Sequence, residues 1–518
     1  MQGFVRANGG SRSATAHAGN LFACKEGMGM NMIGVRHWKK ALAIAVMASA
    51  LCVFSPQALG QSKFAVVYHF KGSDGFGPMA GVIEGVDSAL YGTTSQGGNA
   101  NLGTAFRFDR ATSALTTLHH FAGTDGSVLY SGLAQGADGL LYGSTFGGGA
   151  AALGTLFRVG TDGQNFVPGY SFSGGDGAKP DDLNLTEAVD GTFYGTTSEG
   201  GANGGGTLFR FDPATGGLTT LYAFPGPAGV DAGLIAGMDG NLYGTTYTGG
   251  AYGSGSVFKV VPATFDVVTL HDFTGTDGAY PVPGALIQGS DGNLYGTTQQ
   301  GGGYGTVYKL DPATLALTTL HRFSAPNDGR SPLGGVIEGG DGYLYGTTVL
   351  GGQGYGTVYR VNPATLAYNI VVWFGGSNGR SPSGNLVRAA NGPLYGVTRL
   401  GGAYNAGTIY RVSLDTTAPV ISNITASPSV LRPANGKMVP VALTVTAADA
   451  VDPAPKSKIT GVTCNQSAAG DWQITGDLTV NLRAKRSGGG ARVYTISVAC
   501  TDASSNIATG SVNVTVPK

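Results

Sequence analysis

DGNLYGTT occupies residues 239–246, and the same eight letters return at residues 291–298. Near-copies of this octet recur along the chain and align on one tyrosine, at Tyr91, Tyr142, Tyr194, Tyr243, Tyr295, Tyr345 and Tyr395. Successive tyrosines lie about fifty residues apart, a spacing typical of arrays in which each repeat forms one small sheet. The octet therefore predicts a series of similar structural units.

Residues 284–323 show what one unit contains. Four short stretches, at 285–289, 293–298, 305–310 and 317–323, alternate β-branched or aromatic residues with small or polar ones, as half-buried strands do. Asp291-Gly292 suits a tight hairpin, and Asp311-Pro312-Ala313-Thr314 suits a type I turn. Four antiparallel strands in each of seven units predict an all-β protein with a seven-bladed β-propeller over residues 61–414.

The repeated octet is then the second strand of each blade with its entry turn. Its tyrosine is expected to be a buried ring of the repeat core, and the glycine after it to permit close approach of a neighbouring sheet. The two threonines favour a strand and satisfy polar groups between blades. The alternative is that the seven tyrosines form a stacked platform for a ligand.

The two ends of the repeat array predict how it closes. The seventh unit ends in GTIYRVSL (407–414), its third strand, and no fourth strand follows before residue 416. A spare strand, FAVVYHF, stands at residues 64–70. We expect it to pair as the outermost strand of the seventh blade, which removes an exposed edge and ties the chain ends together.

The first 60 residues read as a leader. A basic segment at 36–40 precedes an apolar segment at 41–54, and small residues precede a predicted cleavage after Gly60. Translation is expected to start between Met28 and Met32. The chain should then be secreted or displayed on a bacterial cell surface. Because Lys+Arg and Asp+Glu both number 31, no long-range field favours nucleic acid as a partner.

Residues after Pro419 lose the glycine-rich repeat. Residues 415–428 are predicted to be a linker, and residues 429–518 an immunoglobulin-like β-sandwich of alternating strands. Cys464 and Cys500 fall in this part of the chain. They are interpreted as a candidate disulfide of an exported domain, with two buried free thiols as the alternative.

The unit resembles the tandem repeat called GloVer, found in exported bacterial choice-of-anchor proteins. The LYGTT core, the glycine-rich stretch from Gly301 to Tyr308 and the DPAT turn carry the resemblance over residues 64–414. It implies extracellular location and surface display, and no established enzymatic activity. The C-terminal part resembles bacterial Ig-like and hyalin-repeat-like modules through VYTISVACTDASSNIA. This chain ends in SVNVTVPK, so no transmembrane anchor is expected after leader cleavage.

Two sets of loop residues are candidates for ligand binding. The loops between blades carry Asp74, Asp125, Asp176, Asp277, Asp328 and Asn378, each followed by glycine. The loops between second and third strands carry Tyr252, Tyr304, Tyr355 and Tyr404. Both sets are expected on one face around the central channel, where carboxylates could bind Ca²⁺ or sugar hydroxyls and rings could stack on sugars. The alternatives are Asp-Gly turn chemistry and loop packing.

Other chemical motifs are weak. Gly375-Gly376-Ser377-Asn378-Gly379 has the form of a nucleophile motif but is a variant of a repeat loop. His69, His119, His120, His271 and His321 occupy one repeat slot or its neighbour, so they are interpreted as exposed strand histidines held too far apart to share a metal.

Three functions remain open at this point. The first is an exported non-enzymatic scaffold that binds a polysaccharide or a cell-surface protein through the loop face, with no cofactor and with Ca²⁺ left open. The second is a carbohydrate-active enzyme, a polysaccharide lyase or hydrolase, on a propeller scaffold. The third is a purely structural cell-surface protein.

Overall fold

The computed structural model describes residues 63–518 except for 182–184, 227–232, 283–285, 325–326, 391, 416, 450–453, 467–469, 487 and 503–505. The predicted leader and its cleavage site lie outside the described residues. The described part consists of strands joined by turns. No helix within it is long and apolar enough to cross a membrane.

Seven antiparallel sheets, numbered here in chain order, fill the described part of residues 63–413. Sheet 1 contains β2 (Ile83–Glu84), β3 (Leu90–Thr94), β4 (Thr104–Phe108) and β5 (Leu115–His120). Sheet 2 contains β6 (Leu133–Gln135), β7 (Leu141–Thr145), β8 (Thr155–Val159) and β9 (Val167–Ser171). Sheet 3 contains β10 (Thr186–Glu187), β11 (Phe193–Thr197), β12 (Gly204–Asp212) and β13 (Gly217–Pro225).

Sheets 4 to 7 repeat the pattern. Sheet 4 contains β14 (Ile235–Ala236), β15 (Leu242–Thr246), β16 (Ser256–Val261) and β17 (Asp266–Asp272). Sheet 5 contains β18 (Ala279–Pro281), β19 (Ile287–Gln288), β20 (Leu294–Gln300), β21 (Thr306–Leu310) and β22 (Leu317–Arg322). Sheet 6 contains β23 (Ile337–Glu338), β24 (Leu344–Thr348), β25 (Thr357–Val361) and β26 (Tyr368–Trp373). Sheet 7 contains β1 (Lys63–His69), β27 (Arg380–Arg388), β28 (Leu394–Leu400) and β29 (Thr408–Ser413).

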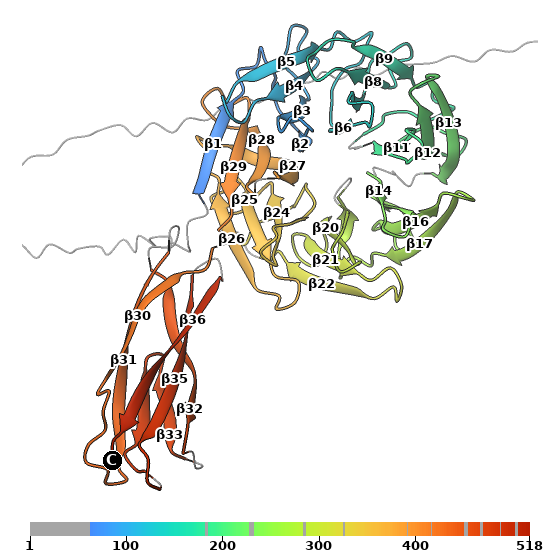
Figure 1. Cartoon of the computed structure of the whole chain (residues 1–518). Helices are drawn as coiled ribbons and strands as arrows, with labels where there is room; N and C mark the ends of the chain where they lie inside the picture. The colour runs from blue at the N-terminus through green and yellow to red at the C-terminus, as the bar shows by residue number, and fades with distance from the viewer. Residues whose placement is uncertain are drawn as a thin grey trace, which may run out of the picture. The chain divides into compact units, whose positions relative to one another are not determined.

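Buried hydrophobic clusters join each sheet to the next. One cluster packs Phe121 of sheet 1 against Phe157 of sheet 2, and five more continue from sheet 2 to sheet 7. A further cluster packs Tyr395 and Ile409 of sheet 7 with Phe106 of sheet 1. The sheets therefore close into a propeller-like ring, in which the short first strands lie inside and β5, β13 and β22 lie outside (Figure 1).

The predicted closure by the N-terminal strand is confirmed. β1 pairs with β29 in antiparallel register, with Phe64 opposite Val412 and His69 opposite Thr408. It lies at the outer edge of sheet 7 (Figure 1). Phe64 also packs edge-on against Phe374 of sheet 6, with ring centroids 5.8 Å apart. The first strand of the ring therefore completes the sheet that the last repeat leaves unfinished.

The repeated octet has a common polar anchor. In five sheets the tyrosine hydroxyl donates to the aspartate four residues earlier, in the pairs Tyr91–Asp87, Tyr142–Asp138, Tyr243–Asp239, Tyr295–Asp291 and Tyr345–Asp341 at 2.6–2.9 Å. The same aspartates accept a backbone N–H of their own turn, as in Asp291 and Asn293. One carboxylate thus stabilises both the hairpin and the buried ring.

The glycine and threonines of the octet also have fixed partners. A Cβ on Gly244 would lie 2.7 Å from Cζ of Phe258, the residue opposite it on the next strand. The expected close approach is therefore to the octet's own sheet, and the prediction of a neighbouring sheet was wrong. The second threonine bonds the residue that opens the third strand, as Thr94 bonds Thr104 at 2.8 Å. Thr93 donates to the Ser131 carbonyl of sheet 2, which supports the expected role between units.

Two more sheets fill the C-terminal part. One contains β30 (Val420–Ser427), β31 (Met438–Ala448), β34 (Thr479–Arg483) and β33 (Trp472–Gly476). The other contains β32 (Lys456–Cys464), β35 (Arg492–Thr501) and β36 (Ile507–Val516). A single hydrophobic cluster that includes Val480 and Ile496 fills the space between them. Residues 415–428, predicted to be a linker, include β30, which pairs with β31 because its side chains continue the alternation.

Cys464 and Cys500 are free thiols, so the candidate disulfide between them is not present. Cys464 pairs in register with Tyr494, and Cys500 pairs with Ser457, on the neighbouring strands β32 and β35. Six residues of strand therefore separate the two thiols, roughly 20 Å, whereas a disulfide needs Cα atoms within about 7 Å. The register of β32 and β35 could not be predicted from the sequence alone.

A buried charged group stabilises the same sheets. Arg492 has a side chain only 2% exposed, and its Nη1 lies 3.0 Å from Oδ2 of Asp471. Asp471 also pairs with Arg483 at 3.2 Å, and Arg492 donates to the hydroxyl of Tyr494 at 3.0 Å. The network gives partners to both Nη atoms of Arg492, while its Nε is buried without a hydrogen-bond partner in the described structure.

Candidate functional site

The loop aspartates between sheets bond within their own loops. One carboxylate oxygen of Asp74, Asp125, Asp176 and Asp277 accepts the backbone N–H three residues earlier, at 2.8–2.9 Å. Asp328 accepts the N–H of Ser324, and the Asn378 side chain accepts that of Gly375. These bonds are turn chemistry, which was the alternative to ligand binding for this set.

The carboxylate of each loop aspartate also faces an aromatic residue on the outer strand before the loop, through its second oxygen in all but Asp328, where both oxygens lie near His321. Tyr68 and Tyr170 donate their hydroxyls to Asp74 and Asp176, each at 2.5 Å. His119, His271 and His321 make the corresponding contact with Asp125, Asp277 and Asp328, at 2.8, 3.0 and 3.1 Å. The five carboxylates therefore link five of the outer strands, β1, β5, β9, β17 and β22, to the loops that leave them.

These contacts correct the interpretation of the histidines. The side chains of His119, His271 and His321 are only 17–21% exposed. His119 stacks on Phe166 with ring centroids 3.5 Å apart, and His321 stacks on Tyr368 at 3.7 Å. Burial lowers the pKa of His321 despite the opposing charge of Asp328. These three histidines are thus half-buried, because the loop that follows each outer strand folds back over the histidine side chain.

Hydrogen bonds lower the pKa of two loop carboxylates, Asp176 and Asp277. Burial alone raises the pKa of Asp277, but the backbone and hydroxyl of Thr274 and the ring of His271 bring it below the usual value. Burial and the bond to Asp176 raise the pKa of Tyr170 to about 12. These pKa shifts arise from burial and from hydrogen-bond partners within the seven sheets and their loops, so they have a structural cause.

The two predicted loop sets do lie along one edge of the sheets. The loop after Asp328 reaches the tyrosine loop of the preceding sheet, where the N–H of Ser331 donates to the Tyr304 carbonyl at 2.9 Å. Ser381 bonds the Tyr355 carbonyl in the same way. The aspartate side chains, however, attach to the outermost strands, so the prediction that they surround the central channel was wrong.

The tyrosine loops present rings to solvent. Tyr252 is 66% exposed, Tyr404 60% and Tyr304 43%, while Tyr355 is half-buried against the cluster between sheets 6 and 7. The guanidinium of Arg330 lies 5.2 Å from the Tyr304 ring centroid. We call Tyr252, Tyr304, Tyr355 and Tyr404 the aromatic arc, since these four tyrosines occupy equivalent loops of the consecutive sheets 4 to 7. The equivalent loops of sheets 1 to 3, at 95–103, 146–154 and 198–206, contain no tyrosine.

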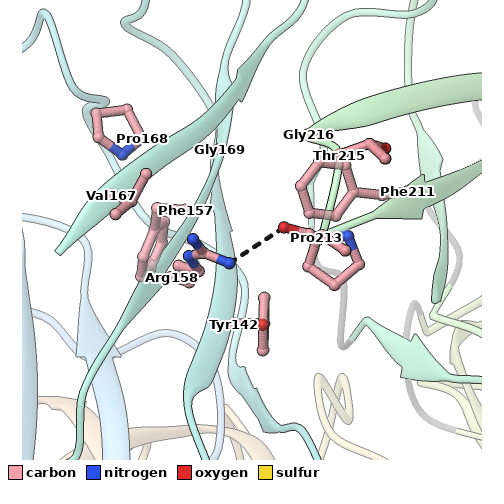
Figure 2. A pocket seen from close by; sticks show the side chains of 11 residues that line it. Tyr142, Phe157, Arg158, Val167, Pro168, Gly169, Phe211, Pro213, Thr215 and Gly216 are labelled. Carbon is pink, nitrogen blue, oxygen red and sulfur yellow. Dashed lines mark hydrogen bonds between the residues drawn. The ribbon is translucent and has the colours of Figure 1, made fainter. Parts of the chain in front are cut away.

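A small pocket lies between sheets 2 and 3 (Figure 2). It has a volume of about 230 Å³ and is lined by side chains that include Tyr142, Arg158 and Phe211. Arg158 spans it by donating to the carbonyl of Pro213 at 3.1 Å, as Figure 2 shows. Small-molecule sites usually enclose about 300–1,000 Å³, so this space is small for a ligand of that class.

The pocket has a cause in the sequence. The outer strands of sheets 1, 4 and 5 place a buried leucine two residues before their last strand residue, namely Leu118, Leu270 and Leu320. Sheet 2 has Gly169 in that slot, in the segment VPGYS. A Cβ added there would point at Phe211, 3.2 Å from its Cζ. The missing leucine side chain leaves the space, and sequence alignment of the repeats could have found it.

Acidic residues at the inner strands are used between sheets. Glu187 accepts the N–H of Ala137 at 2.9 Å, and Glu338 accepts that of Ser290 at 3.1 Å. Glu84 of sheet 1 accepts the N–H of Ala390 of sheet 7 at 2.8 Å. These carboxylates stabilise turns of the preceding sheet. Carboxylates at both edges of the ring thus have structural partners, whereas three tyrosines of the aromatic arc, Tyr252, Tyr304 and Tyr404, are exposed to solvent.

Comparison with known proteins adds a family and some distant structural likenesses. Residues 52–233 and 229–439, more than half of the chain, match the model of the Gloeobacter/Verrucomicrobia repeat. No curated protein matches the chain in sequence.

Solved structures that resemble the chain do so at low identity. A chain described as the extracellular domain of the one component system BT4673 from B. thetaiotaomicron is 12% identical, with a TM-score of 0.44 over 88% of this chain and 57% of that one. TolB from Acinetobacter baumannii is 16% identical, with a TM-score of 0.35 over 57% of this chain and 63% of that one. An oligogalacturonate lyase in complex with manganese is 12% identical, with a TM-score of 0.44 over 68% of this chain and 93% of that one. The chain spans less than two thirds of the first two, and at these TM-scores none of the three bears on function.

Proposed function

Because the chain belongs to the Gloeobacter/Verrucomicrobia repeat family, we propose that it is an exported, non-enzymatic scaffold that binds polysaccharide through the aromatic arc. In this proposal residues 61–414 form a seven-bladed β-propeller and the C-terminal sheets form an immunoglobulin-like module. The basic and apolar segments at 36–54 support export, with cleavage after Gly60.

The exposure of Tyr252, Tyr304 and Tyr404 carries the proposal. An exposed phenol presents an apolar face that stacks on the C–H face of a sugar and a hydroxyl that bonds to it. Equivalent loops on consecutive sheets repeat this contact, so a long polymer can engage several rings at once. Multiple weak contacts along one chain raise the apparent affinity well above that of a single contact.

The alternative of catalysis at the loop aspartates has less support. A glycosidase or lyase needs carboxylates or a metal site that converge on one bond. Asp125, Asp277 and Asp328 instead recur at one position in separate sheets, and each contacts a histidine of its own outer strand. Repetition of one contact around the ring favours a structural role for them.

The test is retention on immobilised polysaccharides, with the eluates assayed for newly released sugar ends. We expect the mature chain to be retained on at least one polymer without release. The double variant Tyr252→Ala, Tyr404→Ala should lose most of this retention, because both rings are exposed and support no core. Tyr222→Ala is the matched control, since it removes a tyrosine of β13 that is 36% exposed. This variant should be retained. Release of sugar ends, or equal retention of the double variant and the control, would contradict the proposal.

A further inference from the structure

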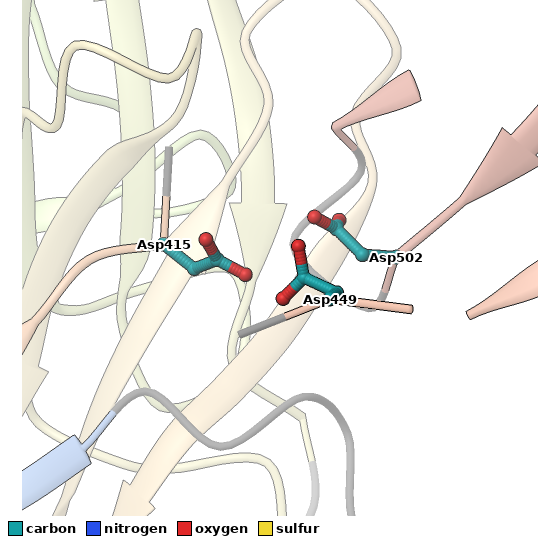
Figure 3. A group of neighbouring side chains, drawn as sticks. All are labelled: Asp415, Asp449 and Asp502. Carbon is teal, nitrogen blue, oxygen red and sulfur yellow. The ribbon is translucent and has the colours of Figure 1, made fainter. Parts of the chain in front are cut away.

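Three aspartates gather where the chain enters the C-terminal sheets (Figure 3). Asp415 precedes β30, Asp449 follows β31 and Asp502 follows β35. One carboxylate oxygen from each lies within 4.8 Å of the others. Since β31 and β35 belong to different sheets, the cluster connects both sheets with the segment that leads into them.

Asp415 supplies an observation beyond the acidic cluster itself. It is only 5% exposed, and its Oδ2 is buried without a hydrogen-bond partner in the described structure. Its Oδ1 accepts the N–H and the hydroxyl of Thr417, at 3.1 and 2.8 Å. Figure 3 shows the carboxylate directed toward Asp449 and Asp502. A buried carboxylate oxygen without a partner is costly, so its position favours a cation beside it.

Asn506 holds two of the three aspartates in place. Its N–H and its Nδ2 each donate to a different carboxylate oxygen of Asp502 at 2.8 Å. The same Nδ2 donates to the main-chain oxygen of Asp415 at 3.0 Å. Burial, with the charges of Asp415 and Asp449 added to it, raises the pKa of Asp502. Within the described residues neither Asp415 nor Asp502 forms an ion pair with a basic side chain.

We propose that Asp415, Asp449 and Asp502 bind one Ca²⁺. Ca²⁺ binds six to eight oxygens at about 2.3–2.6 Å, so two oxygens on one ion lie at most about 5 Å apart, in agreement with the cluster. An all-carboxylate set suits a hard cation and lacks the nitrogen and sulfur ligands that zinc prefers. Water completes the coordination. The bound ion neutralises the repelling carboxylates and fixes the segment that follows β29 to the C-terminal sheets.

The site is distinct from the loop aspartates of the ring and does not depend on polysaccharide binding. Its test compares thermal unfolding of the whole mature chain in EDTA and in millimolar Ca²⁺. A Trp373→Phe background is used, so that the fluorescence of Trp472 on β33 reports the C-terminal sheets. Wild type should gain at least about 4 °C in Ca²⁺, because ligand binding to the folded state alone stabilises a domain of this size by that order.

Two variants make the test specific. Asp415→Asn keeps an oxygen for Thr417 but removes a ligand charge, so its melting temperature should not rise in Ca²⁺. In EDTA it should melt at or above wild type, since it relieves repulsion among the carboxylates. Asp477→Asn removes an exposed charge from the turn between β33 and β34 and should respond to Ca²⁺ as wild type does. No Ca²⁺ shift in wild type, or equal shifts in both variants, would overturn the proposal. A lower melting temperature of Asp415→Asn in EDTA would also overturn it, because a hydrogen-bonding role alone would then explain the residue.

Discussion

The carboxylates of the ring and those of the C-terminal entry differ in how they are satisfied. Asp277 accepts hydrogen bonds from the backbone and hydroxyl of Thr274 and contacts His271. Asp415 has one oxygen that accepts from Thr417 and another, buried, that accepts from nothing described. A repeated acid with repeated internal partners is therefore structural, whereas an unrepeated acid with one buried, unpartnered oxygen is a better candidate for binding a ligand.

The largest expected effect concerns the closure on which the ring depends. Deletion of residues 61–70 removes β1, leaves β29 as an exposed edge and takes Phe64 and Phe70 from their clusters. We expect the ring to lose its cooperative unfolding transition, while the C-terminal sheets, which have their own core, keep theirs. Calorimetry measures the unfolding transitions of the ring and of the C-terminal sheets, and tryptophan fluorescence follows the same transitions in a separate experiment. A truncated chain whose ring melts at the parent temperature would refute the closure.

The next prediction tests the buried ion pair within the C-terminal sheets. Asp471→Ala leaves the buried guanidinium of Arg492 without its carboxylate. Removal of one partner of a buried pair costs about 3–5 kcal/mol, so urea unfolding should show a loss of that order. Exposed Asp477→Ala is the control and should change the free energy of unfolding by less than about 0.5 kcal/mol. Equal losses in the two variants would mean that the pair contributes nothing.

A third prediction contrasts two glycines of the ring. A Cβ on Gly244 would lie 2.7 Å from Phe258, whereas one on Gly169 would lie 3.2 Å from Phe211, beside the open pocket. Gly244→Ala should cost about 1–3 kcal/mol through overpacking. Gly169→Ala should cost less than about 1 kcal/mol, since the Phe211 ring has space to move. Urea unfolding of both variants gives the difference, and a greater loss at Gly169 would show that the pocket is not packing space.

A fourth prediction uses pH to examine the structural role of Asp277. Its folded pKa lies below the ordinary value of about 3.9. The charged form therefore stabilises the fold above the unfolded pKa, and this contribution disappears as the pH falls through the lower folded pKa. Asp277→Asn should be less stable than wild type at pH 7 by about 1–3 kcal/mol, with the gap closing below about pH 4. A gap that stays constant down to pH 2 would rule out the carboxylate as its source.

Much of the ring could be predicted because local chemistry repeats there. Alternating side chains and the Asp291-Gly292 turn identified four strands in a unit, and the spare strand at 64–70 identified the closure. The structural use of the loop aspartates was foreseen only as an alternative, because a hydrogen bond between His119 and Asp125 depends on how a loop folds back. The spacing of Asp291 and Tyr295 was visible in the octet, yet their bond was not anticipated.

The C-terminal part was less predictable because its contacts join residues far apart in sequence. Nothing in the local sequence places Asp415 beside Asp502, and only the pairing of β30, β31 and β35 brings them together. The register of β32 and β35 also determines that the two cysteines do not pair, since Cys464 lies opposite Tyr494 and not Cys500. The segment 415–428 was interpreted as a linker because Pro419 follows a change in composition, although the strand alternation resumes at Val420.

The number of Ca²⁺ ions bound per chain tests the contrast between the two groups of carboxylates most directly. Equilibrium dialysis of the whole mature chain against Ca²⁺, with Asp277→Asn and Asp415→Asn alongside, counts them. The account predicts one ion for wild type and for Asp277→Asn, and none for Asp415→Asn. Several ions per wild-type chain, reduced in Asp277→Asn and unchanged in Asp415→Asn, would place the cation sites on the ring and contradict it.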